Sequence, residues 1–320
     1  MKRVMKPVAA TFLITLGLLV QGQGLLGEPE QRGRGRGGQP QPPRQLAWVD
    51  RSGEVVGTIG PQMSGILDPS ISPDGSKVAV RGRAERGDTD SLWILEGSTK
   101  HRITNNEGAE RHMIWSPDGA RIAYSLQDQG GVSNLFVRAA DGSGEDQPLI
   151  VSEGIHKWYP SWSPDARTAV FHTNNPDTQA RDLWFVNTSD GTTGVLVDDP
   201  SIEALARLSP DGRFVAYQSD KTGQMEIFVT TFPRSDLRAQ ISTNGGTWAK
   251  WAGNELFYWA GNTLMVVQTS AEGGFSAGEP QELFTGAQVG MGENNNMTSY
   301  NPEYDVSADG TRFVVTQRVN

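Results

Sequence analysis

The phrase Trp115-Ser-Pro-Asp-Gly119 is followed, two residues later, by the apolar run Ile122-Ala-Tyr124. Proline directly after serine, then aspartate, then glycine is typical of a type I turn with a positive φ at its exit. Such a turn joins two short strands. Five further copies of the phrase, two of them degenerate, begin at Ile71, Trp162, Leu208, Trp251 and Val306. The chain is therefore built from repeats of one turn-and-strand unit.

The turn aspartates measure the length of this unit. They, or the residues in their place, are Asp74, Asp118, Asp165, Asp211, Asn254 and Asp309, in steps of 44, 47, 46, 43 and 55 residues. A third apolar run follows in five units, as in Leu183-Trp-Phe-Val186. A period in the forties with several short strands per unit is the pattern of propeller blades. The sequence predicts an all-β fold, a six-bladed β-propeller.

The sixth unit has no third strand after it, because ten residues follow Gly310. The missing strand motif lies nearer the N-terminus, in Leu46-Ala-Trp-Val-Asp50 and Glu54–Thr58. We expect N- and C-terminal strands to close the last blade together, which leaves no free sheet edge. The predicted propeller spans residues 46–320.

The first 45 residues are expected to form a targeting segment and a linker. Three basic residues within the first six precede the uncharged apolar run Val8–Val20. This run has the length of a secretory signal and is shorter than the roughly 20 residues of a membrane span. We expect a signal peptide over residues 1–22, with an uncleaved membrane anchor as the alternative, and a disordered Arg/Gly/Pro-rich linker over residues 23–45. The mature chain would be periplasmic or secreted, with no membrane span after cleavage.

Composition excludes several classes of function. The 320 residues contain no cysteine, so there is neither a disulfide nor a thiolate metal site. The formal net charge of −9 is opposite to that of a duplex nucleic-acid binder. The His-Arg-Asp and Asp-Phe-Gly motifs of protein kinases do not occur. We expect a monomer that binds a protein or peptide and no nucleic acid.

The repeated phrase resembles the WD40-like repeats of TolB-type six-bladed β-propellers. The start at Leu46–Gly53 and the end at Tyr304–Gly310 are also similar to the propeller region of bacterial serine/threonine kinases, but without the kinase. This resemblance covers 275 residues, 46–320, and implies the fold. For function it implies an exported scaffold for a protein or peptide, similar to TolB in the periplasm. The same fold includes metal-dependent lyases of acidic sugars.

One ring of side chains is the candidate site. The inner strand of each blade lines the central channel, and we expect the first residues of these strands to surround one mouth. Counting six residues back from each turn aspartate or its equivalent selects Asp68, His112, Tyr159, Leu205, Trp248 and Glu303. All except Leu205 are predicted partner contacts. The aromatic side chains of Tyr159 and Trp248 suit contact hot spots, but they could equally belong to the core.

Three members of this ring raise the possibility of a cation. Glu303, Asp68 and His112 come from consecutive blades once the ring closes, and two carboxylates with an imidazole could hold a divalent ion. Against this, the chain has 4 histidines, and only His112 falls in the ring. We favour an exported, non-enzymatic interaction scaffold with no catalytic residue and no cofactor. The alternative is a metal-dependent carbohydrate lyase or lactonase that uses the central channel.

Overall fold

The computed structural model describes residues 43–83, 89–175, 179–291 and 302–319. The predicted signal peptide, residues 1–22, and the predicted linker up to residue 42 lie outside these ranges. Within them the chain forms strands and turns, and we find no helix that is long and apolar enough to cross a membrane.

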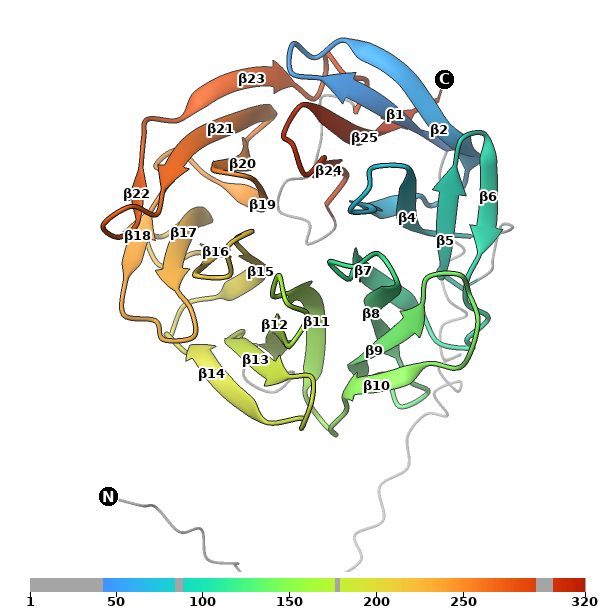
Figure 1. The fold of residues 1–320 in the computed structure, drawn as a ribbon, viewed down its shortest axis with the longest axis horizontal. Helices are drawn as coiled ribbons and strands as arrows, with labels where there is room; N and C mark the ends of the chain where they lie inside the picture. Colours follow the sequence, from blue (N-terminus) through green and yellow to red (C-terminus); the bar gives the residue numbers. More distant parts are fainter. Residues whose placement is uncertain (1–42, 84–88, 176–178, 292–301, 320) are drawn as a thin grey trace, which may run out of the picture. The chain divides into compact units, whose positions relative to one another are not determined.

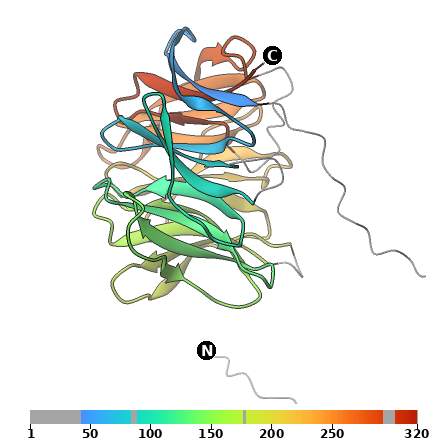
Figure 2. The ribbon, with the colours of Figure 1, turned by 90° about the vertical axis from the view of Figure 1, so that its right-hand side faces the viewer.

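Six antiparallel sheets stand around one axis as the blades of a propeller (Figure 1). From the axis outward, blade 1 contains β3 (Leu67–Ile71), β4 (Lys77–Gly82), β5 (Ser91–Glu96) and β6 (Thr99–Arg102). Blade 2 contains β7 (Glu110–Trp115), β8 (Arg121–Gln127), β9 (Ser133–Ala139) and β10 (Gln147–Ile150). Blade 3 contains β11 (His156–Trp162), β12 (Thr168–Asn174), β13 (Leu183–Asn187) and β14 (Thr193–Val197). Figure 2 shows blades 1 and 2 from the outside of the ring.

The remaining blades follow the same plan. Blade 4 contains β15 (Glu203–Leu208), β16 (Phe214–Ser219), β17 (Glu226–Thr231) and β18 (Arg238–Gln240). Blade 5 contains β19 (Thr247–Ala252), β20 (Glu255–Ala260) and β21 (Thr263–Ser270), with β22 (Ser276–Ala277) and β23 (Gln281–Thr285) both paired to β21. Blade 6 contains β24 (Tyr304–Val306), β25 (Arg312–Arg318), β1 (Arg44–Asp50) and β2 (Val55–Met63). The predicted all-β, six-bladed fold is confirmed.

The composite sixth blade closes the ring as predicted. β1 pairs with β25 over its whole length, from Arg44 opposite Arg318 to Asp50 opposite Arg312. β1 begins two residues before the expected start of the propeller at residue 46, because Arg44 still pairs in the sheet and its guanidinium lies 2.6 Å from the carboxylate of Glu303. Closure by both termini pairs β25 on both of its edges, with β24 on one side and β1 on the other.

The Ser-Pro-Asp-Gly turns explain why the aspartates recur. In blade 1, Ser72 Oγ donates to Asp74 Oδ1 at 2.6 Å and accepts from Lys77 N at 2.9 Å. The same serine-to-aspartate bond is present at Ser116, Ser163, Ser209 and Ser307. Hydrogen bonds, first of all from Ser72, lower the pKa of Asp74 to about 2. These carboxylates are occupied by the turns, so they have a structural role.

The apolar core lies mainly between the blades. The cluster between blades 1 and 2, for example, joins Leu92 and Ile94 of β5 to Met113 and Trp115 of β7 and to Tyr124 of β8. Because each blade buries both faces in this way, its middle strands are apolar on both sides. Blade packing therefore holds the inner strands in fixed positions around the axis.

Candidate functional site

A β-bulge interrupts the inner strand in five of the six blades. In β7, for example, the register with β8 shifts between Arg111 and Ile114. The residue six before the turn aspartate lies in each bulge with φ between +53° and +60°, and these residues are Asp68, His112, Tyr159, Leu205 and Trp248. We call these five the bulge ring. A left-handed backbone costs a non-glycine residue about 1–2 kcal/mol, so surrounding contacts must hold it in place.

Part of that support comes from the blade that precedes each bulge. Asp68 N donates to the carbonyl of Pro302 at 3.0 Å. Leu205 N donates to His172 Nδ1, and Trp248 N donates to Gln218 Oε1, both at 3.4 Å. The bulge turns an N–H out of its own sheet and toward the neighbour, and it therefore links blades around the axis.

The side chains of the bulge ring lie beneath the surface rather than at a mouth. Tyr159 and Trp248 are 1% and 2% exposed and belong to the largest apolar cluster, together with Leu205. The ring of Tyr159 stacks on His112 with centroids 3.7 Å apart. Burial lowers the pKa of His112, and neighbouring arginine cations lower it further. These side chains form a buried layer around the axis.

The predicted cation set is not gathered at one point. Asp68 lies 3.4 Å from Arg81 Nε, and Glu303 pairs with Arg44 at the start of β1. Burial raises the pKa of Asp68, with the Arg81 guanidinium acting against this effect. Among the described residues, no three His, Asp or Glu side chains are grouped so that they could hold a metal ion.

A second ring, four residues before the turn aspartate, surrounds an open pocket. Its members are Ser70, Ile114, Ser161, Arg207, Lys250 and Asp305, and we call them the mouth ring. The pocket has a volume of about 370 Å³ and is also lined by turn residues such as Pro73 and Pro210. The turns of blades 1, 2, 3, 4 and 6 thus meet around this mouth, and we call this side of the propeller the turn face.

Sequence analysis missed the mouth ring by two residues. The bulge lies between the residue six positions before the turn aspartate and the residue four positions before it, and it changes which side chains face the axis. No turn motif in the sequence marks the position of the bulge. A usable signal was present, however. Three of the six repeats carry a charged residue at the mouth-ring position, namely Arg207, Lys250 and Asp305.

The charges of the mouth ring are unequal. Lys250 Nζ lies 2.9 Å from Asp305 Oδ1, and Asp305 Oδ2 accepts from Ile71 N at 2.8 Å. Arg207 donates to the carbonyl of Ala206 at 3.1 Å and forms no ion pair with a described carboxylate. Two cations and one anion therefore line the pocket.

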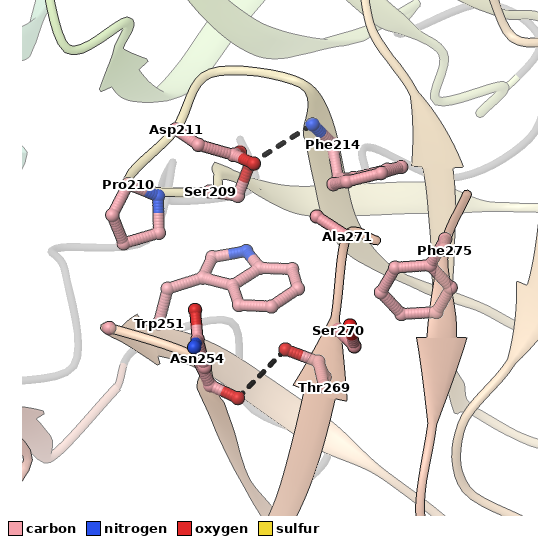
Figure 3. A pocket seen from close by; sticks show the side chains of 11 residues that line it. Ser209, Pro210, Asp211, Phe214, Trp251, Asn254, Thr269, Ser270, Ala271 and Phe275 are labelled. Carbon is pink, nitrogen blue, oxygen red and sulfur yellow. Dashed lines mark hydrogen bonds between the residues drawn. The ribbon is translucent and has the colours of Figure 1, made fainter. Parts of the chain in front are cut away.

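Two further pockets adjoin the central one on the turn face. The first, of about 240 Å³ between blades 4 and 5, shares Ser209, Pro210 and Trp251 with it (Figure 3). The second, of about 450 Å³ between blades 1 and 2, shares Ser72, Pro73 and Trp115 with it. Because these two blade boundaries are opposite each other in a ring of six, the three pockets follow one diameter. We call them together the turn-face groove.

The sequence also contains a formal match to a hydrolase motif. Gly274-Phe-Ser276-Ala-Gly278 has the wording of a nucleophile elbow, which requires a sharp turn between a strand and a helix. Here Ser276 lies in the two-residue outer strand β22, is exposed, and pairs opposite Ser270. No described histidine contacts it. This geometry does not provide a catalytic serine.

Comparisons with known proteins agree with the fold. No protein-family model matches the chain. Tol-Pal system protein TolB of Francisella tularensis is 31% identical over 157 residues, which cover 48% of this chain and 35% of TolB. The structure of a putative TolB from Agrobacterium tumefaciens aligns with a TM-score of 0.66 at 18% identity, over 88% of this chain and 99% of that chain. An oligogalacturonate lyase in complex with manganese aligns with a TM-score of 0.56 at 14% identity, over 85% of this chain and 77% of that chain.

The chain is a TolB-like six-bladed β-propeller. The matched region spans about a third of the length of the Francisella TolB, 35%, and none of these matches points to a kinase domain. The chain shares its fold with TolB proteins and with an oligogalacturonate lyase in complex with manganese, so the fold leaves the choice of function to the site.

Proposed function

We propose that this TolB-like propeller is an exported, non-enzymatic scaffold that binds an extended segment of a partner protein along the turn-face groove. The observation that carries the proposal is that three pockets adjoin one another across the turn face and share lining residues such as Trp115 and Trp251. A groove along a diameter suits an extended peptide better than a compact small molecule. Its relative TolB is a protein of the Tol-Pal system, and membership of such a system is in line with a binding function.

The physical logic is one of a rigid receptor. The walls of the groove are turns whose serines and aspartates are already hydrogen-bonded, such as Ser209 with Asp211 at 2.6 Å. A receptor that is ordered before binding loses little conformational entropy when a peptide docks, so more of the contact energy appears as affinity. Trp115 and Trp251 add aromatic surface, which is typical of contact hot spots.

Selection from a random dodecapeptide display library on the purified chain tests this proposal. Ala308 is exposed on the rim of the central pocket, so Ala308→Trp should obstruct the groove without touching the core. Ala277→Trp, on the exposed strand β22, is the matched control. We expect the selected peptides to bind with one-to-one stoichiometry, to lose about tenfold or more in affinity on the Ala308 variant, and to bind the control like wild type. Failure to select peptides, or equal binding to both variants, would refute the groove.

The alternative function has its own test. Elemental analysis of the purified chain, paired with melting curves with and without EDTA, measures whether a divalent ion is held. One tightly bound ion per chain with a lower Tm after chelation would favour a metal-dependent lyase or lactonase. Export is tested separately, by N-terminal sequencing of the mature chain for cleavage after residue 22.

A further inference from the structure

Arg207 is a nearly buried cation at the floor of the turn-face groove. It lies on β15, is 9% exposed, and lines the central pocket. Its Nη1 donates to the carbonyl of Ala206 at 3.1 Å and lies 3.5 Å from the carbonyl of Pro160. These carbonyls satisfy hydrogen-bond donors but do not cancel the charge. An ion taken out of water is costly unless an opposite charge accompanies it.

The neighbouring carboxylate does not serve this purpose. Asp305 is held by Lys250 Nζ at 2.9 Å and by Ile71 N at 2.8 Å, which takes one contact for each of its oxygens. Burial lowers the pKa of Arg207, and the charge of Asp305 acts against this effect at a distance. The buried Asp68 also acts on the guanidinium at a distance, and the ring of Tyr159 lies 5.9 Å from its Cζ. No described carboxylate forms an ion pair with Arg207, which lines the pocket beside the Lys250–Asp305 pair.

The space in front of Arg207 is large enough for an acidic group. The pocket volume of about 370 Å³ exceeds what one side chain occupies, and the hydroxyl of Ser161 lies on the same wall. Ser161 Oγ accepts from Leu208 N at 3.1 Å, so its own proton is available to a ligand oxygen. Arginine binds carboxylates through two parallel hydrogen bonds, which makes it a selective partner for such a group.

We propose that Arg207, with Lys250 beside it, is a carboxylate-recognition site that selects partner segments carrying an aspartate or glutamate over the propeller axis. The proposal rests on the proposed function, because it assigns a specificity to the same groove. A free carboxylate and an acidic side chain share the chemistry, and the two arms of the experiment separate them.

The first arm uses the peptides selected by display. We expect acidic residues to be enriched at one fixed position. Changing that residue to its amide should weaken binding to wild type by about tenfold or more, as for a hydrogen bond to a charged group. The same change should have no effect on the Arg207→Gln protein, whereas Arg318→Gln, at an exposed site on β25, should behave like wild type. Peptides without acidic enrichment, or an amide change without effect, would overturn the site.

The second arm does not need a peptide. Glutarate, added at constant ionic strength, should raise the Tm of wild type and of Arg318→Gln but not of Arg207→Gln, because a ligand that binds only the folded state stabilises it. If no peptide is selected but glutarate stabilises wild type alone, the carboxylate site stands and the peptide-scaffold function fails. If glutarate has no effect on wild type, the site is refuted whatever the peptides do. Tighter binding of oligogalacturonate than of the best peptide would overturn the peptide assignment.

Discussion

The bulge ring and the mouth ring lie two residues apart on the same inner strands, and both are largely buried, yet only the mouth ring lines a pocket. Tyr159 of the bulge ring is 1% exposed and stacks on His112 within the core. Ser161, two residues later, lines an open pocket together with Arg207 of the next blade. The β-bulge between the two positions separates a layer that holds the blades together from a layer that faces a ligand. Depth along the channel, and not repeat position alone, decides what each ring does.

The largest expected effect comes from truncating a side chain of the buried layer that the bulge ring forms. Tyr159→Ala should lower the free energy of unfolding by about 3–5 kcal/mol, because it removes a large buried ring between two histidines and leaves a cavity. Tyr159→Phe should leave the free energy of unfolding unchanged or raise it slightly, since the buried hydroxyl has no hydrogen-bond partner among the described residues. Urea denaturation measures both. Similar losses for the two variants would mean that the hydroxyl, and not the ring, supports this layer.

The fold was largely accessible from the sequence, whereas the depth of each ring was not. The turn phrase repeats six times and predicts blade number and closure. The bulge depends on positive φ values at positions that hold five different residue types, from Asp68 to Trp248, so neither residue type nor spacing predicts it. Arg207 was overlooked for the same reason, because the count stopped at Leu205. The turns could be predicted because they depend on neighbouring residues in the sequence. The bulges could not, because contacts with the preceding blade hold their strained backbone.

One strand crosses both layers and should respond to pH. β15 carries Glu203 at its buried start, then Leu205 and Arg207. Burial raises the pKa of Glu203 to about 7, with hydrogen bonds from Ser201 and Ser219 acting against it. The folded state thus holds the proton more tightly than the unfolded chain. This stability is present below the unfolded pKa of about 4.5 and is lost as pH rises through about 7.

The free energy of unfolding of Glu203→Gln, relative to that of wild type, should therefore rise by about 3 kcal/mol between pH 4.5 and pH 8. Denaturant midpoints at several pH values measure this difference. Glu255→Gln, which loses an ion pair with Arg51 instead, controls for the amide substitution and should keep the wild-type pH slope. Parallel pH profiles for wild type and Glu203→Gln would contradict the expected titration.

The rim of the mouth offers a smaller, matched comparison between two tryptophans. Trp115 Nε1 donates to the carbonyl of Ser70 in the preceding blade at 2.9 Å. Trp162 is equally buried, but its Nε1 has no hydrogen-bond partner among the described residues. Trp115→Phe should therefore cost about 1 kcal/mol more than Trp162→Phe, because it alone removes a hydrogen bond to the neighbouring blade. Equal losses by thermal or urea denaturation would show that the link between blades does not contribute.

The smallest effect is expected at a turn that departs from the repeat. Ala166 adopts φ of +57° where the equivalent residues are glycines, such as Gly119 at +70°. Ala166→Gly should stabilise the chain by about 0.5–1 kcal/mol, the left-handed strain relieved less the extra entropy of glycine in the unfolded state. Gly119→Ala should have the opposite sign and a similar size. A Cβ there would lie 3.8 Å from Pro73 Cδ, which is ordinary contact, so backbone strain alone should act. If both substitutions destabilise the chain, favourable contacts of the Ala166 methyl outweigh its backbone strain. The turns at Ala166 and Gly119 would then be stabilised in different ways.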